Sequence, residues 1–429
     1  MRRESTRAIL SPTVGKRLGF NNLWSALPDN FSALRHRDFR LFWFGALLSF
    51  FGTWIQNVGQ GWLVFELTKS ESLLGLLTLF SAGPMMVLTP LGGWLADRFD
   101  KKVILTITQS ALALTALTLA LAVYLGFASF PLIAGLAAIS GTAAAIDIPT
   151  RHTMISTIVP KEDLANAVPL NAATFNLARL AGPAVGGFLL ERYGAATCYF
   201  VNGVSFLALI IAIQLIRVNS FPNSEMSGKM IENLKEGFRY VLDRPDFRLL
   251  ASMVFCTAFF GMFYLALLPA LAKEKFGLGG NGLGMLMAST GVGAVAGLLL
   301  LASLSRLPAR GLLLATAMGG VGLGAMGLSL SSHPWQAMVS LAVLGAGGSM
   351  FLSGANATYQ ALSPPEIRGR VISLHVWAVA AAHPLGSVLF GWISERMSLE
   401  VAFAIGGSAV VGMSLAVYLF APTIRQLTV

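Results

Sequence analysis

Long apolar runs, bounded by charged residues, Gly or Pro, follow one another along the chain. A helix needs about 20 predominantly apolar residues to cross the hydrocarbon core of a bilayer. The runs predict twelve membrane-spanning helices, at about residues 41–65, 73–95, 103–126, 130–150, 164–190, 195–217, 249–272, 282–304, 311–330, 335–358, 369–394 and 400–421. The composition agrees, because only 12% of the residues are charged, against about 25% in a soluble globular protein. An ordinary water-soluble fold is excluded.

The first six predicted helices resemble the last six in sequence. The tetrapeptide Asp-Phe-Arg-Leu at residues 38–41 recurs at 246–249. At a constant offset of 204, Pro160, Glu162, Gly182, Gly187, Glu191, Arg192 and Gly203 match Pro364, Glu366, Gly386, Gly391, Glu395, Arg396 and Gly407. An even number of helices in each copy places both copies the same way up, which is typical of transporters that bind substrate between their halves.

We therefore predict an all-α membrane protein with two pseudo-symmetric six-helix bundles, at residues 1–217 and 249–429. The connector at 218–248 has apolar residues at helical spacing among charged ones, which predicts an amphipathic helix at the membrane surface. Two roles remain open for that helix. It either joins the halves mechanically or only anchors the chain to the surface.

Positive charge is concentrated on one predicted side of the membrane. The net charge is +10, and 24 of the 30 Lys and Arg residues lie in the N-terminal tail, the even-numbered connections and the C-terminal segment. The positive-inside rule then predicts that both termini are cytoplasmic. The orientation of the chain in the membrane explains the excess of basic residues. The net charge therefore gives no support to nucleic acid as a partner. The first 40 residues lack the apolar core of a secretory signal, so we expect the first span to remain in the mature protein.

The connection between the second and third predicted helices carries the stretch GGWLADRFDKKVIL, which resembles the motif of the major facilitator superfamily at this place. The motif positions are Gly93, Asp97, Arg98, Asp100, Lys101 and Lys102. Because Asp100 stands where the family has Gly, the sequence leaves open whether the turn between the second and third helices is as tight as in the family. The resemblance implies that Asp97 lies against the start of the eleventh helix, near 367–369, in the outward-facing state. It also implies that Lys101 and Asp147 complete a charge relay at this gate. The alternative is that the basic residues only fix the topology.

A second motif lies in the fifth predicted helix, where Gly182, Pro183, Gly186 and Gly187 form the pattern GPxxGG. Small residues allow helices to approach closely, and a proline bends the helix. The pattern is similar to the antiporter motif of exporters in the superfamily, although close packing alone also explains it. The stretch from Ile146 to Pro183 narrows the resemblance to the transmembrane secretion effector branch. That branch includes the enterobactin exporter.

Few ionisable residues fall within the predicted spans, where charge is costly and therefore suggests function. Arg179 lies in the fifth helix, and the repeat places His383 of the eleventh helix at the equivalent position. Arg179 is a candidate for holding an anionic substrate, or for pairing with a carbonyl that Pro183 frees. His383 is a proton-coupling candidate because imidazole titrates near physiological pH, or else it is a packing residue.

Neutral polar and aromatic residues on the first helix suggest a site for a partly polar, uncharged or zwitterionic molecule. They are Trp54, Gln56, Asn57 and Gln60, with Trp62 beside them. Because helices 1, 4, 7 and 10 line the cavity in the family, the resemblance adds Tyr264, Asn356 and Tyr359. Each of these residues can instead join helices by hydrogen bonds. Glu66 and Glu191 are expected to be solvated charges at the outer surface.

No nucleotide-binding motif, metal-ligand cluster or nucleophile–base arrangement appears in the sequence, so we predict neither an enzyme nor a bound cofactor or metal. The resemblance implies a multi-pass exporter of the bacterial inner membrane that moves a hydrophobic or amphipathic small molecule by proton-coupled alternating access. A siderophore is the leading substrate, and multidrug or macrolide efflux is the alternative. An alternative of another class is a receptor or assembly protein that keeps the fold without transport. We expect a monomer in the lipid bilayer, with small-molecule substrate and protons as partners.

Overall fold

A computed structural model describes residues 29–217, 230–304 and 310–421, and these residues form helices and no strands. The first half contains α2 (Arg37–Thr68), α3 (Glu71–Arg98), α4 (Lys101–Tyr124), α5 (Phe130–Ile158), α6 (Leu164–Tyr193) and α7 (Ala195–Leu215). The second half contains α9 (Pro245–Gly261), α10 (Tyr264–Ala270), the π-helical η3 (Leu271–Lys275), α11 (Gly280–Ser303), α12 (Arg310–Leu330), α13 (Pro334–Leu362), α14 (Arg368–Arg396) and α15 (Leu399–Phe420). Short helices η1 (Asp29–Arg35) and η2 (Lys161–Asp163) precede α2 and α6.

Eleven helical segments of the described residues are long and apolar enough to cross a membrane. The twelfth long helix, α6, has 30 residues but a more polar sequence, with Asn166, Asn171, Asn176 and Arg179 along it. It packs against α2 of its own half and α11 of the other. The four polar side chains are partly buried.

Asp100 does not strain the turn between α3 and α4. Its φ is −60°, so the position does not need a glycine. The carboxylate accepts a hydrogen bond of 2.8 Å from the backbone N–H of Lys102 and so caps the first turn of α4. The doubt raised by the missing family glycine is therefore removed.

The span predicted at 249–272 is present as one membrane-spanning segment, Pro245–Lys275, but it is not one regular helix. Helix α9 ends at Gly261 and α10 begins at Tyr264, and the break places the ring of Phe263 in a stack on Phe390, with ring centroids 4.0 Å apart. Pro269 adds to the irregularity, because proline lacks an amide hydrogen and its ring crowds the preceding turn. The packing of distant rings decides this break, so the local sequence did not indicate it.

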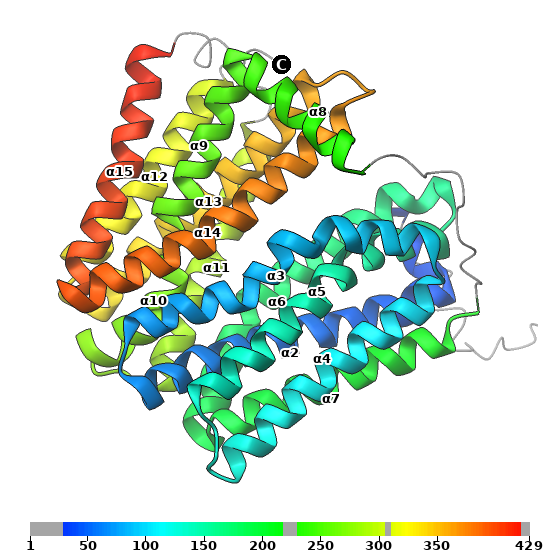
Figure 1. Cartoon of the computed structure of the whole chain (residues 1–429), viewed down its shortest axis with the longest axis horizontal. Coiled ribbons are helices and arrows are strands. Elements are labelled where there is room, and N and C mark those ends of the chain that lie inside the picture. Colours follow the sequence, from blue (N-terminus) through cyan, green and yellow to red (C-terminus); the bar gives the residue numbers. More distant parts are fainter. Residues whose placement is uncertain (1–28, 218–229, 305–309, 422–429) are drawn as a thin grey trace, which may run out of the picture.

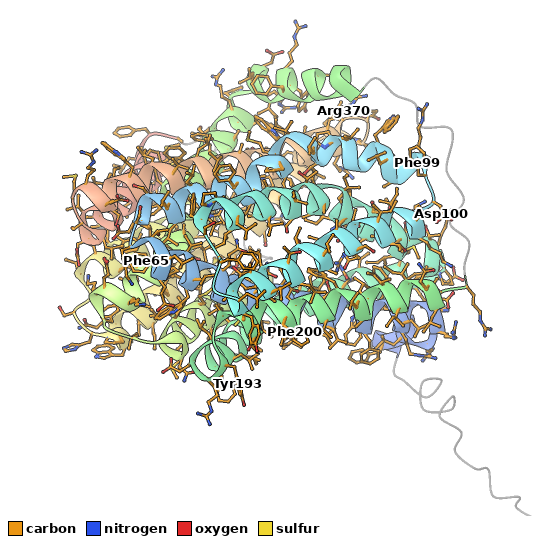
Figure 2. The ribbon with its side chains drawn as sticks, turned by 60° about the horizontal axis from the view of Figure 1, so that its bottom comes forward. Phe65, Phe99, Asp100, Tyr193, Phe200 and Arg370 are labelled. Carbon is orange, nitrogen blue, oxygen red and sulfur yellow. The ribbon has the colours of Figure 1, made fainter. Side chains whose placement is uncertain are left out.

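The two halves meet at one end of the molecule and diverge toward the other (Figure 1). Helix α3 packs against α14, and α6 against α11. We call the end at which Thr68, Glu71, Tyr193 and Arg396 lie the closed end. The opposite end, where α8 (Met230–Asp243) lies, is the α8 end. Figure 2 shows Phe99 and Asp100 at the opposite end of the molecule from Phe65.

Helix α8 occupies the connector for which the sequence predicts an amphipathic helix. It packs against α9 and α14 of the second half. Val241 is buried there, and Glu236 forms an ion pair of 2.5 Å with Arg370 at the start of α14. The helix is thus attached to the second half, next to the end of α14 that faces away from the closed end.

Candidate functional site

Glycines bring the two halves into backbone contact at the closed end. A Cβ built on Gly187 of α6 would stand 2.6 Å from the carbonyl oxygen of Gly280 and 2.9 Å from Cα of Gly284, both in α11. A Cβ on Gly391 of α14 would stand 2.5 Å from the carbonyl oxygen of Glu71 in α3. Gly187 and Gly391 are equivalent in the sequence repeat, so the same close approach occurs twice. No larger residue fits either position without moving a backbone.

Gly182 and Gly186 of the GPxxGG motif pack within the first half. Gly182 would meet Trp54 and Gly186 would meet Ile55, both in α2, with a Cβ at 2.6 Å and 3.0 Å respectively. Trp54 therefore packs edge-on against Phe175 and over Gly182 within its own half. The motif thus packs α6 against α2 on one side and against the other half on the adjacent side.

A third contact between the halves lies between α2 and the α10–η3 segment. Gly61 approaches the ring of Pro269, with an ideal Cβ at 2.9 Å. Beyond it, Lys273 forms an ion pair of 3.0 Å with Glu66 and lies over the ring of Trp62. Glu66 is about half exposed, as expected for a solvated charge, and it also has a partner from the other half.

The halves separate between the middle of α3 and its end. The indole N–H of Trp377 in α14 donates to the carbonyl oxygen of Met86 in α3 at 3.1 Å. Eleven residues later, roughly 16 Å along the helix, the carboxylate of Asp97 makes no hydrogen bond or ion pair within the described residues. A Cβ on Gly93 or on Gly369, near the start of α14, would meet no atom within 4 Å. The partner that the family resemblance implies for Asp97 is not in contact in this conformation.

The basic residues of this motif have local partners. The guanidinium of Arg98 lies 5.0 Å from the ring centre of Trp94, and the ammonium of Lys102 donates to the carbonyl oxygen of Ile216. Lys101 is buried at the start of α4. These contacts lie within the first half, so they neither require nor exclude a role in a gate between the halves.

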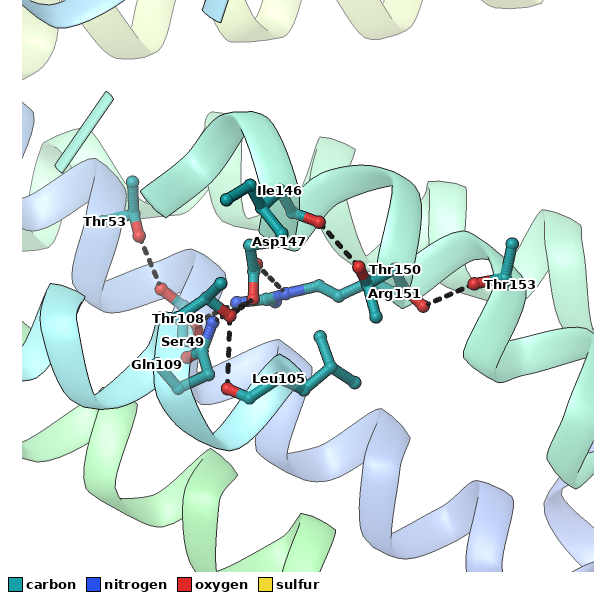
Figure 3. A network of polar contacts seen from close by, with 10 residues as sticks. All are labelled: Ser49, Thr53, Leu105, Thr108, Gln109, Ile146, Asp147, Thr150, Arg151 and Thr153. Carbon is teal, nitrogen blue, oxygen red and sulfur yellow. Dashed lines mark hydrogen bonds and ion pairs between the residues drawn. The ribbon is translucent and has the colours of Figure 1, made fainter. Parts of the chain in front are cut away.

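Asp147 lies deeper than the sequence suggested, eleven residues before the end of α5 (Figure 3). Its carboxylate accepts hydrogen bonds from Thr108 at 2.9 Å and Gln109 at 2.7 Å, and it pairs with Arg151 at 2.5 Å. Arg151 also donates to Ser49 of α2 at 3.1 Å. The pair forms across Pro149 and is almost fully buried. The structure thus places Asp147 in a network that joins α2, α4 and α5, rather than beside Lys101.

Arg179 and Tyr264 meet in the middle of the molecule, one from each half. Tyr264 lies within electrostatic reach of Arg179 and of Thr290 in α11, and Thr290 Oγ1 has no hydrogen-bond partner within the described residues. Pro183, one turn beyond Arg179 on the same face of α6, lies against Gly284 of α11. Arg179 therefore faces the second half just below the packed closed end. Both residues were predicted as substrate contacts, and the structure brings them together.

The polar residues of α2 divide into two groups. Gln56 accepts a hydrogen bond of 2.7 Å from Asn202 of α7 and donates to Gln60 at 3.4 Å, so this group joins helices within the first half. Asn57 is exposed and lies one turn before Gly61, which contacts the second half. A side chain one turn from such a contact shares its face. Among Gln56, Asn57 and Gln60, Asn57 is thus the residue that faces the other half.

The two predicted residues of α13 are less favourably placed. Asn356 accepts a hydrogen bond of 3.1 Å from Gln360 one turn later. Tyr359 is only 2% exposed, and its ring packs against Phe247 and His375 inside the second half. In this conformation Tyr359 is a packing residue.

His383 lies at the position in α14 that corresponds to Arg179. It is largely buried, and its Nε2 has no hydrogen-bond partner within the described residues. Ser387, one turn later, lies against Gly75 of α3, so this face of α14 looks toward the first half. Within the described residues, no three His, Cys, Asp or Glu side chains are grouped to hold a metal ion.

Helices that meet at one end and separate at the other, with repeated halves and polar groups between them, define a membrane transporter of the major facilitator type. The comparison with known proteins gives the family. Residues 29–426 match the transmembrane secretion effector family, and the chain belongs to it.

Known relatives and structures agree with this assignment. The chain is similar to the enterobactin exporter EntS of Shigella flexneri, with 25% identity over 86% of this chain and 88% of that protein. It is also similar to the multidrug efflux pump Tap of Mycolicibacterium fortuitum, with 25% identity over 90% of this chain and 95% of that protein. Its fold is shared by a POT family transporter solved in complex with 5-aminolevulinic acid, with a TM-score of 0.75, 11% identity, and coverage of 94% of this chain and 99% of that one.

Proposed function

We propose that the protein is a secondary active exporter that moves a hydrophobic or amphipathic small molecule across the bacterial inner membrane. The observation that carries the proposal is the unequal contact between the halves. Backbones touch at Gly187 and Gly391, whereas Gly93, Asp97 and Gly369 have no partner across the interface among the residues that the structure describes. This is what one end state of alternating access requires.

Topology and family together support the proposed direction of transport. With both termini in the cytoplasm, as the positive-inside rule predicts, the α8 end faces the cytoplasm and the structure is the inward-facing state. In the opposite state, Asp97 would move to the start of α14, whose helix dipole favours a carboxylate. Relatives that are exporters support outward movement of the substrate.

The substrate class follows from the groups between the halves. Arg179 supplies one positive charge, and Tyr264 and Asn57 supply neutral hydrogen-bonding groups beside apolar helix faces. Such a set suits a largely aromatic or amphipathic molecule with some anionic character. A siderophore meets this description, and the likeness to EntS favours it.

The proposal is tested with the purified protein in proteoliposomes under a proton gradient. We expect Arg179→Gln to lower the affinity for a catecholate siderophore about tenfold or more, because a charge-assisted hydrogen bond contributes roughly 1.5–3 kcal/mol. Asn176→Ala is the control, since its amide bonds to its own helix. Equal affinity in both variants and the parent would remove Arg179 from the substrate site.

Proton coupling remains a prediction, and His383 is its candidate carrier. Its buried, unpartnered Nε2 can accept a proton when the surroundings change. We expect His383→Gln to abolish the dependence of transport on the proton gradient while binding persists. A normal pH dependence in this variant would assign coupling to another group.

Multidrug efflux is the second candidate. The likeness to Tap favours it, and stacked aromatic residues such as Phe255 and Phe259 offer apolar surface to unrelated molecules. Transport of several chemically unrelated cations, unaffected by Arg179→Gln, would favour this function over siderophore export.

A further inference from the structure

Besides Glu66, two carboxylates cross the interface at the closed end, and each of these two meets the start of a helix in the opposite half. Glu191, near the end of α6, accepts a hydrogen bond of 2.9 Å from the backbone N–H of Asn281 in α11. Glu395, near the end of α14, accepts a hydrogen bond of 2.9 Å from the backbone N–H of Ser72 in α3. In both cases the donor is the second residue of its helix.

The residue before each of these helices completes the contact. Ser70 caps α3 and donates its hydroxyl to Glu395 at 2.5 Å. Gly279 precedes α11, and a Cβ there would stand 2.4 Å from the carboxylate of Glu191. The hydroxyl of Ser70 strengthens the contact of Glu395, and the lack of a side chain on Gly279 leaves room for the carboxylate of Glu191. Glu191 is exposed, as expected for a solvated charge, and it also contacts the opposite half.

The two contacts are related by the sequence repeat. Glu191 and Glu395 are separated by the same offset of 204 as Gly187 and Gly391, which lie one turn earlier in each helix. Each helix thus places a glycine against the opposite backbone and, one turn later, a carboxylate at the start of the opposite helix. Packing and charge act at the same two places.

Electrostatics favours the conformation in which the halves are in contact at the closed end. A carboxylate near the end of its own helix meets the negative end of the helix dipole, which is unfavourable. At the start of another helix, the unpaired N–H groups and the positive end of the dipole stabilise it. Both carboxylates lose these partners when the halves separate at the closed end. Their interaction energy is available in one conformation only.

We propose that Glu191 and Glu395 form a two-fold latch that holds the closed end shut and so sets the balance between the two states of the transport cycle. The proposal rests on the proposed function only in treating the closed end as a gate. The latch stabilises the inward-facing state, and Asp97 at the other end stabilises the opposite one. Its two members act on the same equilibrium, so their effects combine.

The test measures opening directly and does not need a substrate. Leu190, in α6, is buried against Gly280 of α11, so Leu190→Cys reports separation of the halves by its rate of reaction with a maleimide. The native Cys198 and Cys256 are first replaced by alanine to give a background without other thiols. The measurement is made on the full chain in lipid nanodiscs.

We expect Glu395→Gln to raise the rate about two- to fivefold, since an exposed carboxylate at a helix start contributes about 0.3–1 kcal/mol. The double variant with Glu191→Gln should raise it by roughly the product of the two single effects. Glu395 is informative because it lies in the other contact, away from the reporter. Glu400→Gln is the matched control, because Glu400 also lies at this end but pairs with Lys275 of its own half, and we expect it to leave the rate unchanged.

Two outcomes would overturn the latch. One is a double variant that reacts at the parent rate while remaining monodisperse with an unchanged unfolding temperature. The other is an equal increase in Glu400→Gln, which would assign the effect to lost surface charge. A rate increase in the latch variants without transport of any tested compound would contradict the exporter proposal and leave the latch intact.

Discussion

Replacing Gly391 with alanine tests the close contact between the halves without changing any charge. The new Cβ would stand 2.5 Å from the carbonyl oxygen of Glu71 and 3.3 Å from Cα of Ser72. Since both are backbone atoms, no side-chain rotation can relieve the contact. Overpacking of this kind costs about 1–3 kcal/mol. The helical preference of alanine over glycine acts in both states and therefore cancels.

This cost falls on the closed end alone, because α3 and α14 separate there in the other state. At 1.4 kcal/mol for each factor of ten, the closed state should lose roughly 5- to 150-fold in relative population. The assay is the maleimide reaction of Leu190→Cys, whose site lies in the other contact, between α6 and α11. A faster reaction there means that the whole end has opened.

Gly135→Ala is the matched control, because Gly135 lies in α5 and a Cβ there would meet no atom within 4 Å. We expect its reaction rate to stay within about twofold of the parent, since nothing at the interface changes. The reasoning is refuted if Gly391→Ala is folded and reacts at the rate of this control. In that event the close approach would not limit the closed state.

Further predictions concern the buried network and the α8 end. Asp147→Asn should lower the stability of the first half by about 3–5 kcal/mol, because it leaves Arg151 buried without a counter-charge, and thermal unfolding of the purified protein measures this. A change in unfolding temperature no larger than that of a surface substitution would contradict it. Hydrogen bonds from Ser32 and His36 hold the pKa of Asp163 below its usual value of 3.8. The ionised carboxylate therefore stabilises the docked η1 segment above that pH, and the stabilisation is lost as the pH falls through the lowered pKa. Asp163→Asn should speed hydrogen exchange of the backbone amides at 32–36 near neutral pH, and unchanged exchange would show that the contact contributes nothing.

The sequence predicted the fold because membrane helices are specified by their own composition. Apolar runs of fixed length and the excess of basic residues on alternate connections depend on the bilayer, not on tertiary contacts. The break between Gly261 and Tyr264 was missed for the opposite reason. It depends on the stack of Phe263 on Phe390, which are 127 positions apart, and no local pattern indicates such a pairing.

The candidate site was only partly predictable. Arg179 stood out because charge within a span is rare, and the structure places it beside Tyr264 of the other half. Tyr359 was predicted only because its helix lines the cavity in the family. Packing decides where its ring points, and the ring lies inside the second half against Phe247. The latch carboxylates were visible in the repeat as the pair Glu191 and Glu395. Their role was not, because the N–H groups they bind belong to another part of the chain.

The central claim is that this protein exports a small molecule, with a siderophore as the leading substrate. The most direct measurement compares the metabolites released by the native organism with and without the gene, in iron-poor and iron-replete media. The account predicts that a catecholate or hydroxamate chelator disappears from the iron-poor medium and accumulates inside the deletion strain. Unchanged chelator release, together with raised sensitivity to several unrelated hydrophobic drugs, would contradict siderophore export and support multidrug efflux.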